Sequence, residues 1–106
     1  MKLLLAIINN DDAQDVNYSL STAGYAATKI SSTGGFLMSG NTTFLIGVPD
    51  EAVDDACSII SKHSERRVQS IPSIARTSPK YGNNAEQVTV GGATVFILTV
   101  DELRRL

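Results

Sequence analysis

The feature of this sequence that most restricts its fold is a continuous apolar run near its start, residues 3–8. A strand with one face in water alternates apolar and polar residues, whereas an uninterrupted apolar run predicts a strand buried on both faces. Such a strand must lie inside a sheet that is covered on each side. The run therefore predicts a layered fold around a central strand, and it is far too short to span a membrane.

A helix is predicted directly after this strand. The polar residues 9–12 suit a helix N-terminus, where side-chain oxygens cap free N–H groups and acidic groups favour the positive end of the dipole. Gly24 stands where a helix would end. The apolar residues between them recur three or four positions apart, which makes one helical stripe: Ala13, Val16, Leu20 and Ala23.

The remaining elements follow from the same kind of pattern. Strands are predicted at 25–30, 41–48, 67–71, 86–90 and 93–100, and a second helix after Pro49 is expected to be capped by Asp50. A short helix is expected after Thr99. The order predicts a single α+β domain over residues 1–106, a ferredoxin-like βαββαβ sandwich. Residues 64–85 are the least regular part and are expected to form a mobile loop before the last strand.

The last strand predicts an oligomer. Phe96 and Leu98 point to one face of the expected sheet, and Val95 and Ile97 point to the other. One layer of helices covers only one of these faces. We therefore expect the second face to be buried against other copies of the chain.

Composition excludes several functions. Net charge is −2, from 9 basic and 11 acidic residues, so no dense basic face for nucleic acid is expected. The pairs Arg66-Arg67 and Arg104-Arg105 are interpreted as solvated surface. Cys57 is the single cysteine, which rules out an intrachain disulfide and favours a reducing, cytoplasmic compartment.

Catalytic patterns are missing. His63 is the single histidine and is interpreted as a helix-end residue, so neither a metal pair nor a Ser-His-acid arrangement is available. The glycine-rich loop lacks the Lys-Ser/Thr pair of a P-loop. An acylphosphatase-like hydrolase would need an arginine near Asn41, and residues 34–40 contain none. The sequence therefore predicts no enzyme, no metal site and no cofactor.

The glycine-bounded loop before the third strand is the candidate for binding. Backbone N–H groups at Gly34-Gly35 can hold an anion, and Phe36 and Phe96 can pack on an aromatic base. Asn41 can donate to and accept from a base edge. These parts suit a nucleotide, although an ordinary hairpin loop with buried apolar side chains has the same composition.

Three segments together resemble a known family: residues 27–37, ATKISSTGGFL; residues 40–48, GNTTFLIGV; and residues 90–96, VGGATVF. They are similar to the P-II-like cyclic-di-AMP receptors of the PstA or DarA type. The resemblance implies a homotrimeric signal-transduction protein that binds this bacterial second messenger between subunits and signals to a protein partner. The ligand-binding set that it implies is Thr28, Gly35, Phe36, Leu37, Asn41, Gly47, Gly92 and Phe96.

The resemblance also implies a role for each part. Phe36 and Phe96 would pack on the bases, Asn41 would recognise an adenine edge, and Thr28 would hold a phosphate with the glycine backbone. Family members commonly carry arginine at the positions of Ala26 and Met38. These departures leave two alternatives open, another adenine nucleotide (AMP, ADP or ATP) as the ligand, or a scaffold that has lost nucleotide binding.

Overall fold

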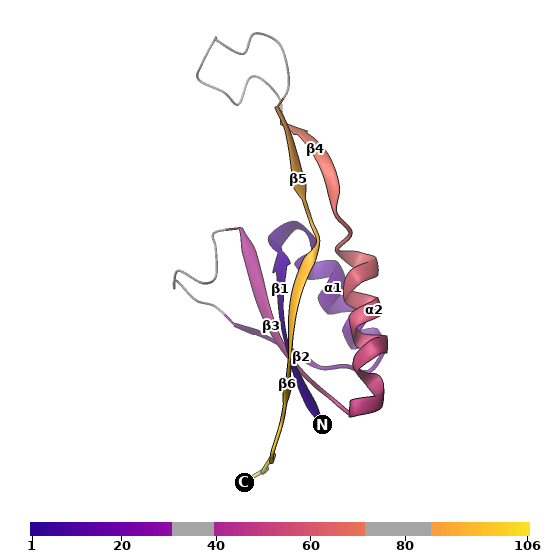
Figure 1. Cartoon of the computed structure of the whole chain (residues 1–106), viewed down its shortest axis with the longest axis vertical. Coiled ribbons are helices and arrows are strands. Elements are labelled where there is room, and N and C mark those ends of the chain that lie inside the picture. The colour runs from indigo at the N-terminus through magenta and orange to yellow at the C-terminus, as the bar shows by residue number, and fades with distance from the viewer. Residues whose placement is uncertain (31–39, 72–85) are drawn as a thin grey trace.

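The computed structural model describes residues 1–30, 40–71 and 86–106, with the side chains of 69–71 and 86–90 left aside (Figure 1). In this part of the chain, neither α-helix is long and apolar enough to cross a membrane. The elements in chain order are β1 (Lys2–Asn9), α1 (Asn10–Thr22), β2 (Ala27–Ile30), β3 (Asn41–Val48), the 3-10 turn η1 (Asp50–Ala52), α2 (Val53–His63), β4 (Arg67–Ile71), β5 (Glu86–Val90) and β6 (Ala93–Thr99).

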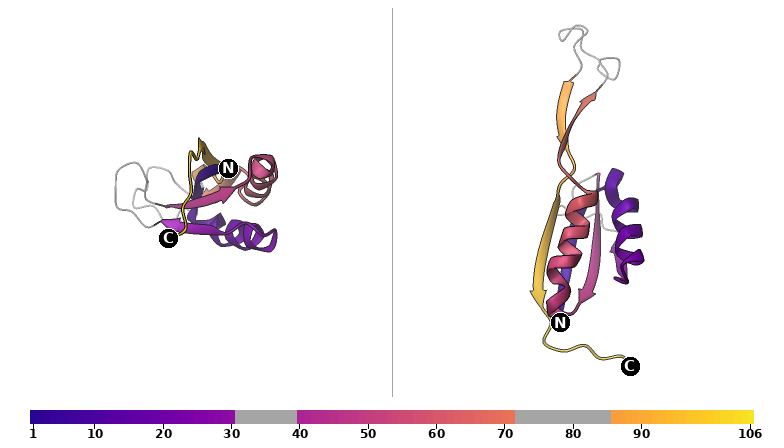
Figure 2. Two further views of the ribbon diagram at one scale, coloured as in Figure 1. Left: turned by 90° about the horizontal axis from the view of Figure 1, so that it is seen from below. Right: turned by 90° about the vertical axis from the view of Figure 1, so that its right-hand side faces the viewer.

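Four of the strands form one antiparallel sheet in the order β2-β3-β1-β6. The apolar run predicted to be central is β1, which pairs with β3 on one side and β6 on the other. Helices α1 and α2 lie side by side on one face of this sheet (Figures 1 and 2). The predicted ferredoxin-like α+β sandwich is confirmed, because these four strands and two helices follow one another as βαββαβ.

The core lies between the sheet and the two helices. Alternate residues of β1 and β3 face the helices and are buried, and they meet one stripe from each helix. Asn9 caps α1 as predicted, accepting a hydrogen bond from the backbone N–H of Asp11 at 2.9 Å. The buried apolar residues are Leu4, Ala6, Ile8, Val16, Leu20, Phe44, Ile46, Val48, Ala56 and Ile60.

The opposite face of the four-stranded sheet, called here the open face, has no helix layer over it among the described residues (Figure 2). Leu5 and Leu45 occupy its centre and are half-buried. Towards its β6 edge, Phe96 and Leu98 are 44% and 45% exposed. Ile97, which points to the helix side of β6, is also 51% exposed, so the helices cover the middle of the sheet and leave β6 open on both sides.

Strands β4 and β5 pair antiparallel with each other in a separate two-stranded sheet, the β-arm. The β-arm projects beyond the end of the four-stranded sheet, between α2 and β6 in the chain (Figure 1). The strand predicted at 67–71 within the irregular segment 64–85 is confirmed as β4. Residues 72–85 lie outside the described residues, so the predicted mobile loop remains a prediction.

Two local predictions were wrong. No helix follows β6, since residues 101–106 have no regular structure; six residues are too few to form a helix without packing partners. Asp50 does not cap the second helix, which begins with the turn η1 and has no side-chain cap. Its carboxylate contacts the amino group of Met1 at 2.7 Å instead, because β1 starts beside the end of β3.

Tyr25, just before β2, ties the sheet to α2 and provides a pH-dependent prediction. Its phenol donates to Oδ2 of Asp55 at 2.6 Å, which raises the pKa of Tyr25 above its ordinary value. A pKa raised by folding stabilises the fold fully below the unfolded value near 10, and this contribution is lost as the pH rises through the folded pKa.

We expect Tyr25→Phe to lower the free energy of unfolding at neutral pH, and we expect the difference from wild type to shrink above about pH 10. Urea denaturation over a pH series measures this difference. Tyr18→Phe is the control, because that phenol is 73% exposed. A Tyr25 difference that stays constant across the alkaline range would contradict the prediction.

Candidate functional site

The open face and its edges carry four of the residues assigned to the ligand. Thr28 in β2, Asn41 and Gly47 in β3, and Phe96 in β6 are all exposed, and their alternation places them on the side away from the helices. Gly92, half-buried, directly precedes β6. The other members of the predicted set lie outside the described residues: Gly35, Phe36 and Leu37, as does Met38.

The strand register separates these residues into two groups. Phe96 pairs with Leu5, Leu5 with Leu45, and Leu45 with Thr28. Thr28 and Phe96 are therefore the two ends of one row across all four strands. With neighbouring strands about 4.8 Å apart, the row spans roughly 14 Å. Thr28, Asn41 and Gly47 lie in the neighbouring strands β2 and β3 and are called here the β2–β3 group, with Asn41 and Gly47 at opposite ends of β3; Gly92 and Phe96, at the other edge of the sheet, are called the β6 group.

The β6 group lies beside the base of the β-arm, where the chain makes a tight bend. Gly91 and Gly92 have φ of +84° and +79°, a backbone region that glycine adopts without strain. The Gly92 N–H donates to the carbonyl oxygen of Ser64. This bend brings the start of β6 against the end of α2.

Arg67 fastens the β-arm to the body of the protein. Its guanidinium contacts both carboxylate oxygens of Asp12, at 2.9 and 3.3 Å, and donates to the carbonyl oxygen of Glu65 at 3.0 Å. Asp12 is 6% exposed, and its hydrogen bond raises the pKa of Arg67. The interpretation of Arg66-Arg67 as a solvated pair was wrong for Arg67. Local sequence patterns do not predict a contact such as that between Arg67 and Asp12, which lie far apart in the chain.

A cavity of about 320 Å³ lies between α2 and the start of β6. Gly92 and Arg66 line it together with Ser61, Ser64 and Cys57. Burial, with a smaller effect from Asp54, raises the pKa of the Cys57 thiol. The thiol is therefore protonated at neutral pH and a poor nucleophile, as expected for a structural cysteine.

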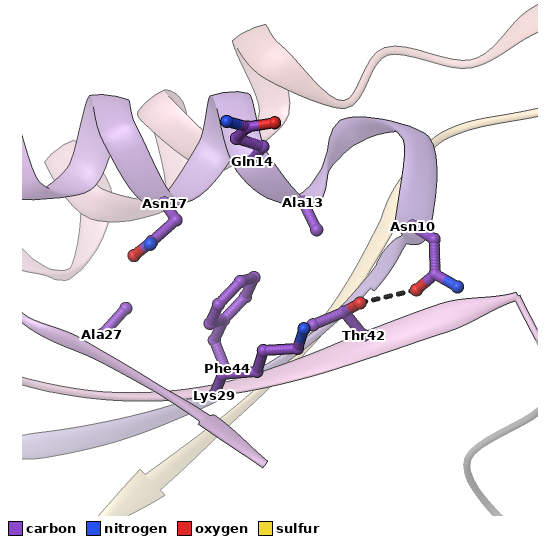
Figure 3. Close-up of a pocket in the computed structure, with 8 residues that line it drawn as sticks. All are labelled: Asn10, Ala13, Gln14, Asn17, Ala27, Lys29, Thr42 and Phe44. Carbon is purple, nitrogen blue, oxygen red and sulfur yellow. Dashed lines mark hydrogen bonds between the residues drawn. The ribbon is translucent and has the colours of Figure 1, made fainter. Parts of the chain in front are cut away.

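A second cavity, of about 410 Å³, lies on the helix side between α1 and strands β2 and β3 (Figure 3). Lys29 and Phe44 come from the strands, and the amides of Asn10, Gln14 and Asn17 come from α1. Asn10 is held by Thr42, whose hydroxyl donates to it at 2.5 Å. Lys29 thus lies on the face opposite to Thr28, its neighbour in β2.

Charge is scarce in the two groups themselves. Ala26, an exposed neutral residue just before β2, adds no cation beside Thr28, and Lys29 points to the helix side. The described residues also contain no group of three His, Cys, Asp or Glu side chains placed to hold a metal ion. What the site offers is an aromatic face, an amide, a hydroxyl and glycine backbone, which suit a ligand with an aromatic base.

Comparison with known proteins gives two results. The family model described as "Cyclic-di-AMP receptor" matches residues 1–106. The chain is also similar to a functionally unknown protein from Pediococcus pentosaceus whose crystal structure is known. The two are 40% identical, the alignment covers 99% of this chain and 96% of that one, and the TM-score is 0.75.

Proposed function

We propose that this chain, which belongs to the cyclic-di-AMP receptor family, binds cyclic di-AMP in sites between the subunits of a homotrimer. The observation that carries the proposal is the full-length family match over residues 1–106. The family is one of receptors, and we infer that this chain acts in the cytoplasm as a signalling protein without catalysis. Its output would be contact with a downstream protein.

The strand register supports a site made by two subunits. Thr28 and Phe96 are separated by the width of the sheet, with Leu5 and Leu45 between them, which favours a site that takes these two contacts from different copies. A neighbouring copy that places its β6 edge beside the β2 edge of the first copy brings the two groups together. A ring of three copies then contains three equivalent sites.

The open face supports the same assembly. Leu5 and Leu45 lie at its centre, and Phe96 and Leu98 leave apolar surface exposed beside them. Apolar surface of this kind marks an interaction face in soluble proteins. Both edge strands of the sheet, β2 and β6, also lack a partner strand on their outer sides in the described residues.

In the assembled site, we assign Phe96 to packing against an adenine and Asn41 to hydrogen bonds with an adenine edge. Thr28 would donate its hydroxyl to a phosphate. Gly92 would contribute its backbone to the site. Gly35, Phe36, Leu37 and Gly47 complete the proposed set.

Isothermal calorimetry of the purified protein with cyclic di-AMP tests this proposal. We expect saturable binding at one ligand per subunit, with sedimentation velocity reporting a trimer. Cyclic di-GMP is the control for base recognition, and AMP, ADP and ATP test the alternative ligands. A folded protein that gives no heat with cyclic di-AMP, or that prefers ATP, would overturn the assignment.

A further inference from the structure

The cavity between α1 and strands β2 and β3 has no part in the proposed function (Figure 3). It lies on the helix side of the sheet, opposite to the face that carries Thr28, Asn41 and Phe96, and none of the described residues assigned to cyclic di-AMP lines it. Its volume of about 410 Å³ falls within the range of about 300–1,000 Å³ that is typical of small-molecule sites. The cavity is therefore large enough for a small ligand of its own.

Lys29 brings an unpaired positive charge to this cavity. It comes from β2 and lines the cavity beside Phe44, which is buried (Figure 3). Its ammonium group makes no hydrogen bond or ion pair with any described residue. Among the described lining residues there is also no aspartate or glutamate. The cavity therefore favours an anion over a cation.

The acidic residues of α1 do not supply the missing counter-ion. The helix contains Asp11, Asp12 and Asp15, and none of them lines the cavity. Asp12 is bound to Arg67 of the β-arm at 2.9 Å instead. The residues of α1 that do line the cavity stand at positions 10, 13, 14 and 17, three or four apart, and so share one face of the helix. That face carries amides and an alanine, with no carboxylate.

Three amides of α1 line the cavity with Lys29: Asn10, Gln14 and Asn17. Asn10 is oriented by Thr42, which is 7% exposed and whose hydroxyl donates to Oδ1 of Asn10 at 2.5 Å. This bond occupies the carbonyl oxygen and leaves the NH2 group of Asn10 available as a donor. The side chains of Gln14 and Asn17 are exposed and make no hydrogen bond with any described residue. The cavity thus offers one ammonium and several amide N–H donors to whatever enters it.

We propose that this cavity binds a small organic anion, whose carboxylate or phosphate group is held by Lys29 and the NH2 group of Asn10. Both kinds of oxyanion accept charge-assisted hydrogen bonds from an ammonium, and either would neutralise the charge that no acidic side chain of the cavity neutralises. Gln14 and Asn17 can donate to and accept from polar groups beside the anionic one. The ligand is therefore expected to carry hydroxyl, amide or carbonyl groups next to a single anionic end.

A neighbouring cavity supports a ligand longer than a bare ion. Gln14, Asn17 and Ala27 line both cavities, so the two adjoin. The second has a volume of about 470 Å³, and the phenol of Tyr18 and the hydroxyl of Ser21 line it. The groove that the two cavities make along α1 has a cation at one end and neutral polar groups at the other.

Nuclear magnetic resonance of the full chain labelled with nitrogen-15 tests the proposal, with sodium phosphate and sodium acetate as the two probes. Sodium chloride keeps the ionic strength constant, because general screening also moves signals. The side-chain NH2 signals of Asn10, Gln14 and Asn17 report on the cavity directly. We expect them to shift saturably at millimolar probe concentrations, since such small probes bind weakly. Tighter binding of phosphate indicates a phosphate ester as the ligand, and tighter binding of acetate indicates a carboxylate.

Lys29→Gln removes the charge and keeps most of the side chain, and it is expected to weaken probe binding by about 10- to 100-fold. Lys62→Gln is the matched control, because it removes an exposed cation from the last turn of α2, outside the cavity. We expect its affinity for the probes to equal that of wild type. Equal affinity in Lys29→Gln and wild type, or equal weakening in both variants, would mean an adventitious ion only and would overturn the proposal. Absence of saturable shifts in the wild type with both probes would overturn it as well. None of these outcomes bears on cyclic di-AMP, whose proposed site lies on the other face.

Discussion

In the proposed homotrimer, mixing subunits of two defective variants is expected to restore cyclic-di-AMP sites that neither variant forms alone. Thr28→Ala removes a hydroxyl from the β2–β3 group, and Phe96→Ala removes the aromatic face from the β6 group. Each substitution is expected to weaken binding by about 10- to 100-fold. Thr28→Ala loses a hydrogen bond to a charged phosphate, and Phe96→Ala loses a stacking contact with a base. The two residues stand at opposite ends of one cross-strand row.

A site between subunits takes its β2–β3 group from one copy and its β6 group from the next. In trimers formed at random from equal amounts of the two variants, about a quarter of the interfaces combine two intact groups. Calorimetry on co-expressed, doubly tagged protein should therefore recover wild-type affinity at about that fraction of the sites. A site within one chain would give no recovery, since every chain in the mixture carries a defect.

The control for this experiment concerns assembly. Phe96 is 44% exposed on the open face, so its removal can weaken the trimer as well as the ligand contact. Phe96→Leu keeps apolar bulk without the aromatic face and separates the two effects. We expect it to remain trimeric by sedimentation velocity and still to bind weakly. A Phe96→Leu variant with wild-type affinity would contradict the stacking role.

Gly91→Ala is expected to destabilise the protein much more than Gly24→Ala. The two glycines have similar φ, +84° and +91°, so a side chain at either position carries a similar backbone strain, about 1–3 kcal/mol. The surroundings differ. A Cβ on Gly91 would lie 2.4 Å from the carbonyl oxygen of Glu65 and 2.8 Å from Nη1 of Arg67, whereas nothing lies within 4 Å of one on Gly24.

The clash at Gly91 falls on backbone, so the β-arm must shift, and the contacts of Arg67 with Glu65 and Asp12 shift with it. Overpacking of this kind typically adds about 1–3 kcal/mol. Urea denaturation of the two variants measures the difference, since the shared backbone strain cancels between them. If Gly91→Ala and Gly24→Ala lowered the free energy of unfolding equally, the base of the β-arm would be able to shift without loss of stability, and Arg67 would not hold it in place.

The elements could be predicted because each is encoded in its own residues. The apolar run of β1, the stripe of α1 with its Asn9 cap, and the glycine pair before β6 depend on local patterning and backbone freedom. At Asp50 the local rule failed because of a distant part of the chain. Asp50 was expected to cap a helix, but the amino group of Met1 lies beside it.

The membership of the candidate site came from the resemblance, and it stays a prediction. Residue types alone did not separate a nucleotide site from an ordinary hairpin around Asn41. They also did not indicate that Thr28 and Phe96 lie a sheet's width apart, because this distance depends on which strands are neighbours. Strand order depends on pairing between distant segments, so local hydrophobic periodicity does not predict it.

The sequence by itself determined the class of fold, the core face of each element and the apolar character of the open face. These follow from hydrophobic periodicity, which is a local property. Only the tertiary structure decided how the charges are used. It pairs Arg67 with Asp12 and lays Arg66 across Gly92. Each of these is a short-range interaction that exists only after distant segments are brought together, which is why the sequence predicted none of them.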